Sequence, residues 1–560
     1  MKLKPYLKFA LVVLPVTYLV LSFVYLANIR QFSIYDNDPP YCYLMNGTNL
    51  ASGHFRVGIV EHPGTPVECF AATVIFIKHI FSGNTVLYQD VLLNSESYLF
   101  TCSKVLALLL ALSTLWAGRY VFRHTGSIAL ALLFQSAPLF FGDIIKMTVS
   151  LSAESFITIT GMAFMAYLFV NAIKSNNPNT TKNLLLFGLF SALLITTKIY
   201  CTPIILLVLF LIPSVKKGLV YIASTGLFTL VLLFPLYNQI RNFAGWVKSM
   251  MFHKGFYGKG DPGVINAGLY KNSLVEIFTK HYLFAFVFFL VVLSFIIALF
   301  AARRKTINGR NFLLPITGVL IFFIAFILII AKQYIYYYPS PLTHQTIIIT
   351  KFYYFIMVFM CFPLAIVLSY KVLSPYISTD LLRTNKQWIY YIGFSILIVW
   401  GGQQAYASST DIPYQNVLSD KTRPMLDIWK DTPLIIVTDG FKVCPEEAYF
   451  LGISYSGRWD APQYFDFMKK TDSNTYLYTT YNDALCFWNE PTDISTILKK
   501  KRRALIYLNG TDSAAEETIL ARICDMQLHK NTRNCRKIYS SGSRYEEIYL
   551  LQTDTIGDFK

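Results

Sequence analysis

Residues 9–27 read FALVVLPVTYLVLSFVYLA, an unbroken run without a charged side chain. A run of this length matches the roughly 20 apolar residues that cross the hydrocarbon core of a membrane as a helix. Residues 282–301 and 312–330 are similar. The chain of 560 residues is 54% hydrophobic and only 14% charged, whereas water-soluble domains carry about 25% charged residues. We therefore expect a protein that lies mostly in a membrane.

Hydropathy predicts a polytopic α-helical membrane module of about eleven helices over residues 1–405. The predicted spans are 9–27, 99–118, 127–142, 154–173, 184–197, 202–215, 218–236, 281–301, 312–331, 352–370 and 388–405. No small-residue cleavage site follows the first span, so we expect it to be retained rather than removed as a signal peptide. Residues 28–98, called the first loop below, contain an apolar stretch at 67–81 that is too short to span. That stretch predicts a helix lying along the membrane surface.

The formal net charge of +17 suggests an anionic partner, but its distribution has a simpler cause. With the N-terminus inside, the predicted inner loops hold 16 of the 49 lysines and arginines and one acid, Asp380. The remaining 33 basic and 31 acidic residues nearly balance. This is the positive-inside pattern that sets the orientation of membrane proteins. Nucleic-acid binding is not needed to explain the charge, and an odd number of spans places the C-terminus outside.

Residues 406–560 differ in composition, with frequent Asp, Glu, Asn, Ser and Thr and no long apolar run. Strands are predicted at 433–440, 504–508 and 546–551, and helices at 446–451 and 513–526. Strands alternating with helices favour a soluble α/β domain on the outer side of the membrane. Cys444–Cys486 and Cys524–Cys535 could form disulfides there, and free thiols fit the sequence equally well.

An acidic pair opens the first loop, in the run Tyr35-Asp36-Asn37-Asp38-Pro39-Pro40-Tyr41. A carboxylate beside a membrane surface can act as a general base that takes a proton from an acceptor hydroxyl. A lone aspartate more often caps a helix or is simply solvated. Asp36 and Asp38 therefore gain weight only from the residues around them.

Those surrounding residues include Leu50, Gly53 and His62-Pro63-Gly64. In this order the first loop resembles that of the GT-C glycosyltransferases, membrane enzymes related to protein O-mannosyltransferases and to the aminoarabinose transferase of lipid A. The resemblance implies a catalytic acid in the pair and substrate contacts from Tyr41 and His62. Asn37 between the acids and Gly64 in place of a second proline depart from the family pattern. Asp38 ranks ahead of Asp36 because of its distance from Tyr41.

Further positions follow the same pattern up to about residue 370. Glu154 resembles the second acid of the family, with Asp143 as a rival, and an ordinary helix N-terminal charge explains Glu154 equally well. Four further residues resemble the donor-binding positions of the family, and they are Lys198, Arg241, Lys351 and Tyr353. A fixed cation there would stabilise the phosphate that leaves a lipid-linked donor. Snorkelling lysines and interfacial anchors explain such residues as readily.

These residues lead to the hypothesis of an inverting hexosyl- or pentosyltransferase. It would move a sugar from a polyprenyl-phosphate-linked donor to a glycan, lipid or protein hydroxyl on the outer side of the membrane. No cofactor is required and no metal site is predicted, although paired acids could hold a divalent metal.

Two other classes remain open at this point. A transporter or flippase is disfavoured because charge is sparse in the middle spans. A scaffold would leave the acids of the first loop unexplained. The short retained N-terminus favours a bacterial inner membrane, whereas sequons at Asn46 and Asn509 keep a eukaryotic secretory pathway open.

Overall fold

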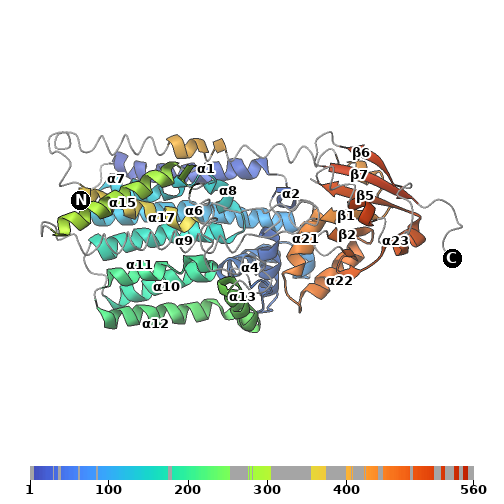
Figure 1. The fold of residues 1–560 in the computed structure, drawn as a ribbon, viewed down its shortest axis with the longest axis horizontal. Coiled ribbons are helices and arrows are strands. Elements are labelled where there is room, and N and C mark those ends of the chain that lie inside the picture. Colours follow the sequence, from blue (N-terminus) through green and yellow to red (C-terminus); the bar gives the residue numbers. More distant parts are fainter. Residues whose placement is uncertain are drawn as a thin grey trace.

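A helical bundle and a small sheet lie at opposite ends of an elongated molecule (Figure 1). The computed structural model describes residues 5–29, 31–35, 39–60, 64–83, 86–174, 180–212, 214–252, 275, 278–279, 282–303, 355–373, 399–404, 406–407, 422, 424–438, 445–479, 484–509, 519–523, 535–540 and 546–552. The first loop lies where the two ends meet. This arrangement agrees with a membrane protein that carries a C-terminal α/β region.

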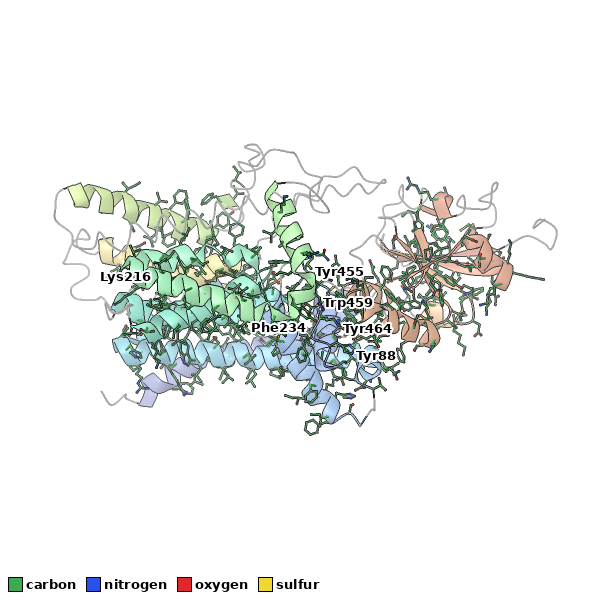
Figure 2. All side chains as sticks on the ribbon, turned by 90° about the horizontal axis from the view of Figure 1, so that it is seen from below. Tyr88, Lys216, Phe234, Tyr455, Trp459 and Tyr464 are labelled. Carbon is green, nitrogen blue, oxygen red and sulfur yellow. The ribbon has the colours of Figure 1, made fainter. Side chains whose placement is uncertain are left out.

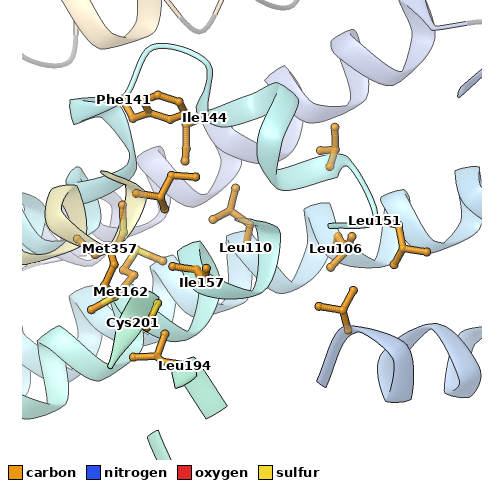
Figure 3. Packing of buried hydrophobic residues seen from close by; sticks show 14 of the residues in the cluster. Leu106, Leu110, Phe141, Ile144, Leu151, Ile157, Met162, Leu194, Cys201 and Met357 are labelled. Carbon is orange, nitrogen blue, oxygen red and sulfur yellow. The ribbon is translucent and has the colours of Figure 1, made fainter. Parts of the chain in front are cut away.

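The bundle is built from apolar helices of very different lengths. They are α1 (Pro5–Asn28), α6 (Ser95–Thr125), α7 (Ile128–Gln135), α8 (Ile144–Val149), α9 (Ala153–Leu168), α10 (Thr181–Thr197), α11 (Ile204–Leu211), α12 (Val215–Leu232), α15 (Tyr282–Arg303) and α17 (Ile356–Leu373). Helix α6 packs against α1 and α9, α10 against α12, and α15 against α17. Figure 3 shows part of the core, where Leu110 of α6, Ile157 and Met162 of α9, and Met357 of α17 gather.

Four helices of the described part are long and apolar enough to cross a membrane. They are Phe9–Asn28, Ser95–Thr125, Ala153–Asn171 and Val215–Leu232. Helix α6, with 31 residues, is about 46 Å long and exceeds the roughly 30 Å hydrocarbon core. Its polar ends therefore reach beyond that core. The membrane character predicted from composition fits these helices.

Two predicted spans are not single helices. Residues 127–142 divide into α7, the 3₁₀ turn η1 (Ala137–Phe140) and a bend, because Pro138 supplies no backbone N–H. Within residues 202–215, helix α11 ends at Leu211, and its eight residues extend about 12 Å. Predicted span 312–331 and most of 388–405 lie outside the described residues, so the number of eleven spans stays a prediction.

The described part of the first loop forms four helices that cap one end of the bundle. They are α2 (Phe32–Tyr35), α3 (Pro40–Ala51), α4 (Thr65–Ile80) and α5 (Leu87–Leu93). Helix α4 confirms that a helix forms at the stretch 67–81, with Val67 and Ile75 buried and Phe76 and Ile80 exposed, and its position along a membrane surface stays a prediction. Its buried face packs against α3 so closely that a Cβ on Gly47 would lie 2.6 Å from the Cβ of Ala71.

The C-terminal α/β region contains one seven-stranded sheet in the order β4-β3-β2-β1-β5-β7-β6. Its elements are β1 (Leu434–Thr438), α21 (Pro445–Ser454), α22 (Ala461–Thr471), β2 (Thr475–Thr479), β3 (Ala484–Phe487), β4 (Glu490–Pro491), α23 (Ile494–Lys501), β5 (Arg503–Asn509), β6 (Cys535–Ser540) and β7 (Glu546–Gln552). Strands β2, β1 and β5 are parallel and the outer strands antiparallel. Alternate residues face opposite sides, so Ile436 joins the core shared with α21 and α22 while Ile435 and Val437 join one containing α23.

Candidate functional site

The structure describes four of the predicted site residues, Tyr41, Glu154, Lys198 and Arg241. The other five lie outside the described residues, and they are Asp36, Asp38, His62, Lys351 and Tyr353. The two cysteine pairings also stay predictions, because Cys444 and Cys524 lie outside the described residues as well.

One carboxylate holds both flanks of the acidic pair. Helix α2 ends at Tyr35, just before Asp36, and α3 begins at Pro40, just after Asp38 and Pro39. Glu96, at the start of α6, accepts hydrogen bonds from the backbone N–H groups of Phe32 (2.7 Å) and Ser33 (2.8 Å) and from the Tyr41 hydroxyl (2.7 Å). Hydrogen bonds to a charged acceptor are among the stronger ones in proteins. Glu96 thus fixes where the acid-bearing segment enters and leaves, a role the sequence did not indicate.

Tyr41 lies in the interior rather than on an open surface. Its side chain is fully buried and meets Tyr449 of α21 edge-on, with ring centroids 5.5 Å apart. Burial, reinforced by the neighbouring Glu96 carboxylate, raises the pKa of the Tyr41 hydroxyl well above its usual value. In this position Tyr41 joins the first loop, α6 and the C-terminal region.

Glu154 and Lys198 form a buried ion pair. Glu154 lies in the first turn of α9 and Lys198 directly follows α10, and both side chains are almost fully buried. A buried charge is tolerable when an opposite charge compensates it, and losing one partner strands the other. The sequence suggested separate roles for these residues, whereas the structure pairs them. Lys198 already has a carboxylate partner, which disfavours it as a phosphate contact.

Arg241 lies at a polar pocket of about 640 Å³. The chain turns here from α12 into the 3₁₀ helix η4 (Phe234–Gln239) and then α13 (Ile240–Phe252). The lining residues are Tyr237, Asn238, Gln239, Ile240, Arg241, Asn242 and Arg458. They supply two guanidinium groups and three side-chain amides, and none of them is acidic. This chemistry suits an anion with several oxygen atoms.

Arg458 was not among the predicted site residues. It reaches the pocket from the turn Tyr455–Asp460, between α21 and α22, although it lies more than 200 residues from Arg241 in sequence. A single arginine in a tail without a recognised motif gives no sequence signal. Only the packing of the C-terminal region on the first loop brings it to the pocket.

An exposed apolar stripe leads along α12 to this pocket. Leu230, Val231 and Phe234 are 71%, 61% and 59% exposed, and Tyr237 at the pocket is exposed as well. Figure 2 shows Phe234 on the side of the bundle that faces the C-terminal region, with Lys216 at the far end. A lipid chain lying along α12 would bring its head group to Arg241.

Glu68, in the first turn of α4, is a second feature that the sequence did not indicate. Its side chain is fully buried, and neither carboxylate oxygen has a hydrogen-bond partner in the part of the chain that the structure describes. Burial raises the pKa of Glu68 well above its usual value. Protonation is the physical response of an acid in this environment.

The described residues contain no group of three histidine, cysteine or acidic side chains that could hold a metal ion. The sequon residue Asn46 is fully buried, and its amide donates hydrogen bonds to the carbonyl groups of Cys42 and Tyr455. It is therefore inaccessible to glycosylation in the folded protein.

No family model matches this sequence, and no curated protein matches it. The likeness to GT-C enzymes therefore rests on the motifs of the first loop and on the order of the residues that follow it.

Proposed function

We propose that this protein is a glycosyltransferase that uses a polyprenyl-phosphate-linked sugar donor. The observation that carries the proposal is the apolar stripe of α12, which ends at a pocket lined by Arg241 and by no acid among the described residues. A ligand with a long apolar chain and an anionic head fits both parts. The GT-C-like order of residues in the first loop supports sugar transfer as the reaction.

In the proposed reaction the acceptor hydroxyl attacks the anomeric carbon of the donor sugar. Asp38, or else Asp36, takes the hydroxyl proton as a new carbon–oxygen bond forms. The bond from the anomeric carbon to the phosphate oxygen breaks, and the polyprenyl phosphate leaves as an anion held by Arg241. A single displacement of this kind inverts the anomeric configuration. Glu96 acts indirectly, by fixing both flanks of the segment that carries the acids.

The test compares Asp38→Asn and Asp36→Asn with the surface variant Asp466→Asn in lipid nanodiscs. The measurement is transfer of radiolabelled sugar from a polyprenyl-phosphate donor to an acceptor extract. Removal of a general base lowers rates by about 10²–10⁴-fold, so we expect that loss in Asp38→Asn and none in Asp466→Asn. Full transfer activity in both Asp36→Asn and Asp38→Asn would contradict the assignment.

A transporter or flippase is the second candidate, and the buried Glu154–Lys198 pair is the observation that favours it. Ionisable residues inside helix bundles often mark transport pathways. Purified protein in sealed vesicles distinguishes the two. Movement of a labelled lipid or solute without any change in its mass supports transport, whereas a sugar-sized mass change supports transfer.

A further inference from the structure

The C-terminal α/β region reaches the pocket beside α12 through one side chain, Arg458. All the other lining residues come from η4 and α13. A pocket formed by a membrane helix alone would need no residue from the soluble end of the molecule. Arg458 therefore adds a basic group to the pocket in addition to its part in the packing of the two regions.

We propose that Arg458 is a second phosphate-binding residue, so that the donor site is assembled from the bundle and the C-terminal α/β region together. This inference rests on the proposed function and names a residue and a region that the function alone does not require. The recognised group is the phosphate of the lipid-linked donor, gripped between Arg241 on one side and Arg458 on the other.

The described lining of the pocket is positively charged. Neither Arg241 nor Arg458 forms an ion pair with an acid in the described part of the chain, and both are exposed. Two arginines that line one cavity make its potential positive, which favours an anion there. Arginine also presents paired donors that match the oxygens of a phosphate. A phosphate thus satisfies both charges at once.

The turn Tyr455–Asp460, which presents Arg458, is held by hydrogen bonds from the first loop. The Asn46 amide donates to the Tyr455 carbonyl (2.9 Å), and the Asn49 amide donates to the Ser456 carbonyl (2.7 Å). His54 Nδ1 lies 2.7 Å from Asp460 Oδ1. The first loop thereby fixes both ends of the turn that presents Arg458.

Close backbone contact and ring stacking complete this support. Gly457 has a φ of 92°, a conformation that favours glycine, and its backbone lies directly against Gly58. The Arg458 guanidinium lies over the Trp459 ring at 4.7 Å, and Arg56 of the first loop approaches the same ring at 5.5 Å. Arg458 is thus held in place before any ligand binds, which lowers the entropy lost on binding.

A coupling between the two parts of the molecule follows. A phosphate that contacts both arginines stabilises the docked C-terminal region, and docking in turn strengthens phosphate binding by the same factor. The first loop, which carries Asp36 and Asp38, lies within this same junction. Donor binding would therefore secure the segment that bears the proposed base.

The experiment measures binding of a polyprenyl phosphate and of the matching polyprenol, which lacks the phosphate, to the full-length protein in nanodiscs. The ratio of the two affinities isolates recognition of the head group from that of the chain. The variants are Arg241→Ala, Arg458→Ala, the double variant and Arg458→Lys. The matched control is Arg503→Ala, because Arg503 makes a similar arginine–tryptophan contact (5.3 Å to Trp429) away from the pocket.

We expect wild type and Arg503→Ala to prefer the phosphate strongly. Each single alanine variant should lower this preference by about tenfold to a hundredfold, the range for hydrogen bonds to a charged group. The double variant should lose less than the product of the single losses, because both residues hold one group. Arg458→Lys should recover part of the preference, since it keeps the charge and loses the paired donors.

Unchanged preference in Arg458→Ala beside a loss in Arg241→Ala would overturn the inference and leave the proposed function intact. Equal affinity of the wild type for phosphate and polyprenol would instead overturn the proposed function. Thermal unfolding of every variant checks that a loss of binding does not arise from a loss of folding.

Discussion

The interior of the bundle and the junction between the first loop and the C-terminal α/β region are held together in different ways. In the bundle, apolar side chains such as Leu110, Ile157 and Met162 provide most of the packing. A few directional contacts are embedded among them, such as the Glu154–Lys198 pair and the Gln135 amide, which donates to two backbone carbonyl groups. At the junction, the Asn46 and Asn49 amides bind individual backbone carbonyl groups, and Gly58 lies directly against Gly457. Apolar packing accepts many arrangements of similar volume, whereas these contacts accept only one.

Apolar packing and directional contacts thus serve different purposes in the two regions. Most positions of the bundle have to be apolar and close-packed, which many side chains satisfy. The junction has to place Arg458 at the pocket and both flanks of the acidic pair beside α6. Directional hydrogen bonds and glycine contacts provide that accuracy. The predictions below test this division.

The largest effect is expected in the buried pair of the bundle. Lys198→Ala should lower the free energy of unfolding by about 3–5 kcal/mol, because it leaves the Glu154 carboxylate buried without its partner. The double variant Glu154→Gln/Lys198→Met should recover most of that loss. The loss of stability is measured by thermal unfolding, monitored through labelling of the Cys201 thiol as it becomes exposed.

Equal stability of the wild type and Lys198→Ala would show that the pair is not a buried charge pair. A double variant that is as unstable as the single one would mean that the site needs its charges for packing. Either result would weaken the description of the bundle as an apolar, tolerant core.

An intermediate effect is expected where the backbones cross at the junction. Gly58→Ala places a methyl group against the backbone of Gly457 and Tyr455, and such overpacking costs about 1–3 kcal/mol. Hydrogen exchange should rise in α3 and α21 together and stay unchanged in α10 and α12. Gly226→Ala in α12 is the matched control, since its new Cβ meets no atom within 4 Å and alanine favours a helix. Unchanged exchange in Gly58→Ala would contradict the tight crossing.

The smallest effect, taken per pH unit, is expected from Glu68, which lies on α4 between the two regions. Its folded-state pKa is raised above the usual 4.5, so the folded protein holds a proton that the unfolded chain releases. Its contribution to stability is therefore complete below about pH 4.5 and is lost as the pH rises through the folded-state pKa. One group changes stability by at most about 1.4 kcal/mol per pH unit.

The variant Glu68→Gln should remove this slope and leave the protein at least as stable as the wild type at pH 7. Denaturation curves from pH 4 to 8 measure it, with the exposed Glu490→Gln as the control. An unchanged slope in Glu68→Gln would show that Glu68 keeps an ordinary pKa.

Local sequence patterns anticipated much of the helical and strand structure. The apolar runs at 9–27 and 218–236 correspond to α1 and α12, and the stretches 433–440, 504–508 and 546–551 overlap β1, β5 and β7. Spans 127–142 and 202–215 were wrong as single helices, because hydropathy measures how apolar a stretch is and not whether its backbone continues. Strands β2, β3, β4 and β6 were missed, since short strands with mixed polarity give little periodicity.

By itself, the sequence determined that this chain is membrane-like and that its tail mixes strands with helices. These properties depend on neighbouring residues along the chain. Only the tertiary structure decided that Glu154 meets Lys198, that Glu96 holds both flanks of the acidic pair, and that Arg458 joins Arg241. Such pairings join segments far apart in sequence, and they depend on how whole helices pack rather than on any local pattern.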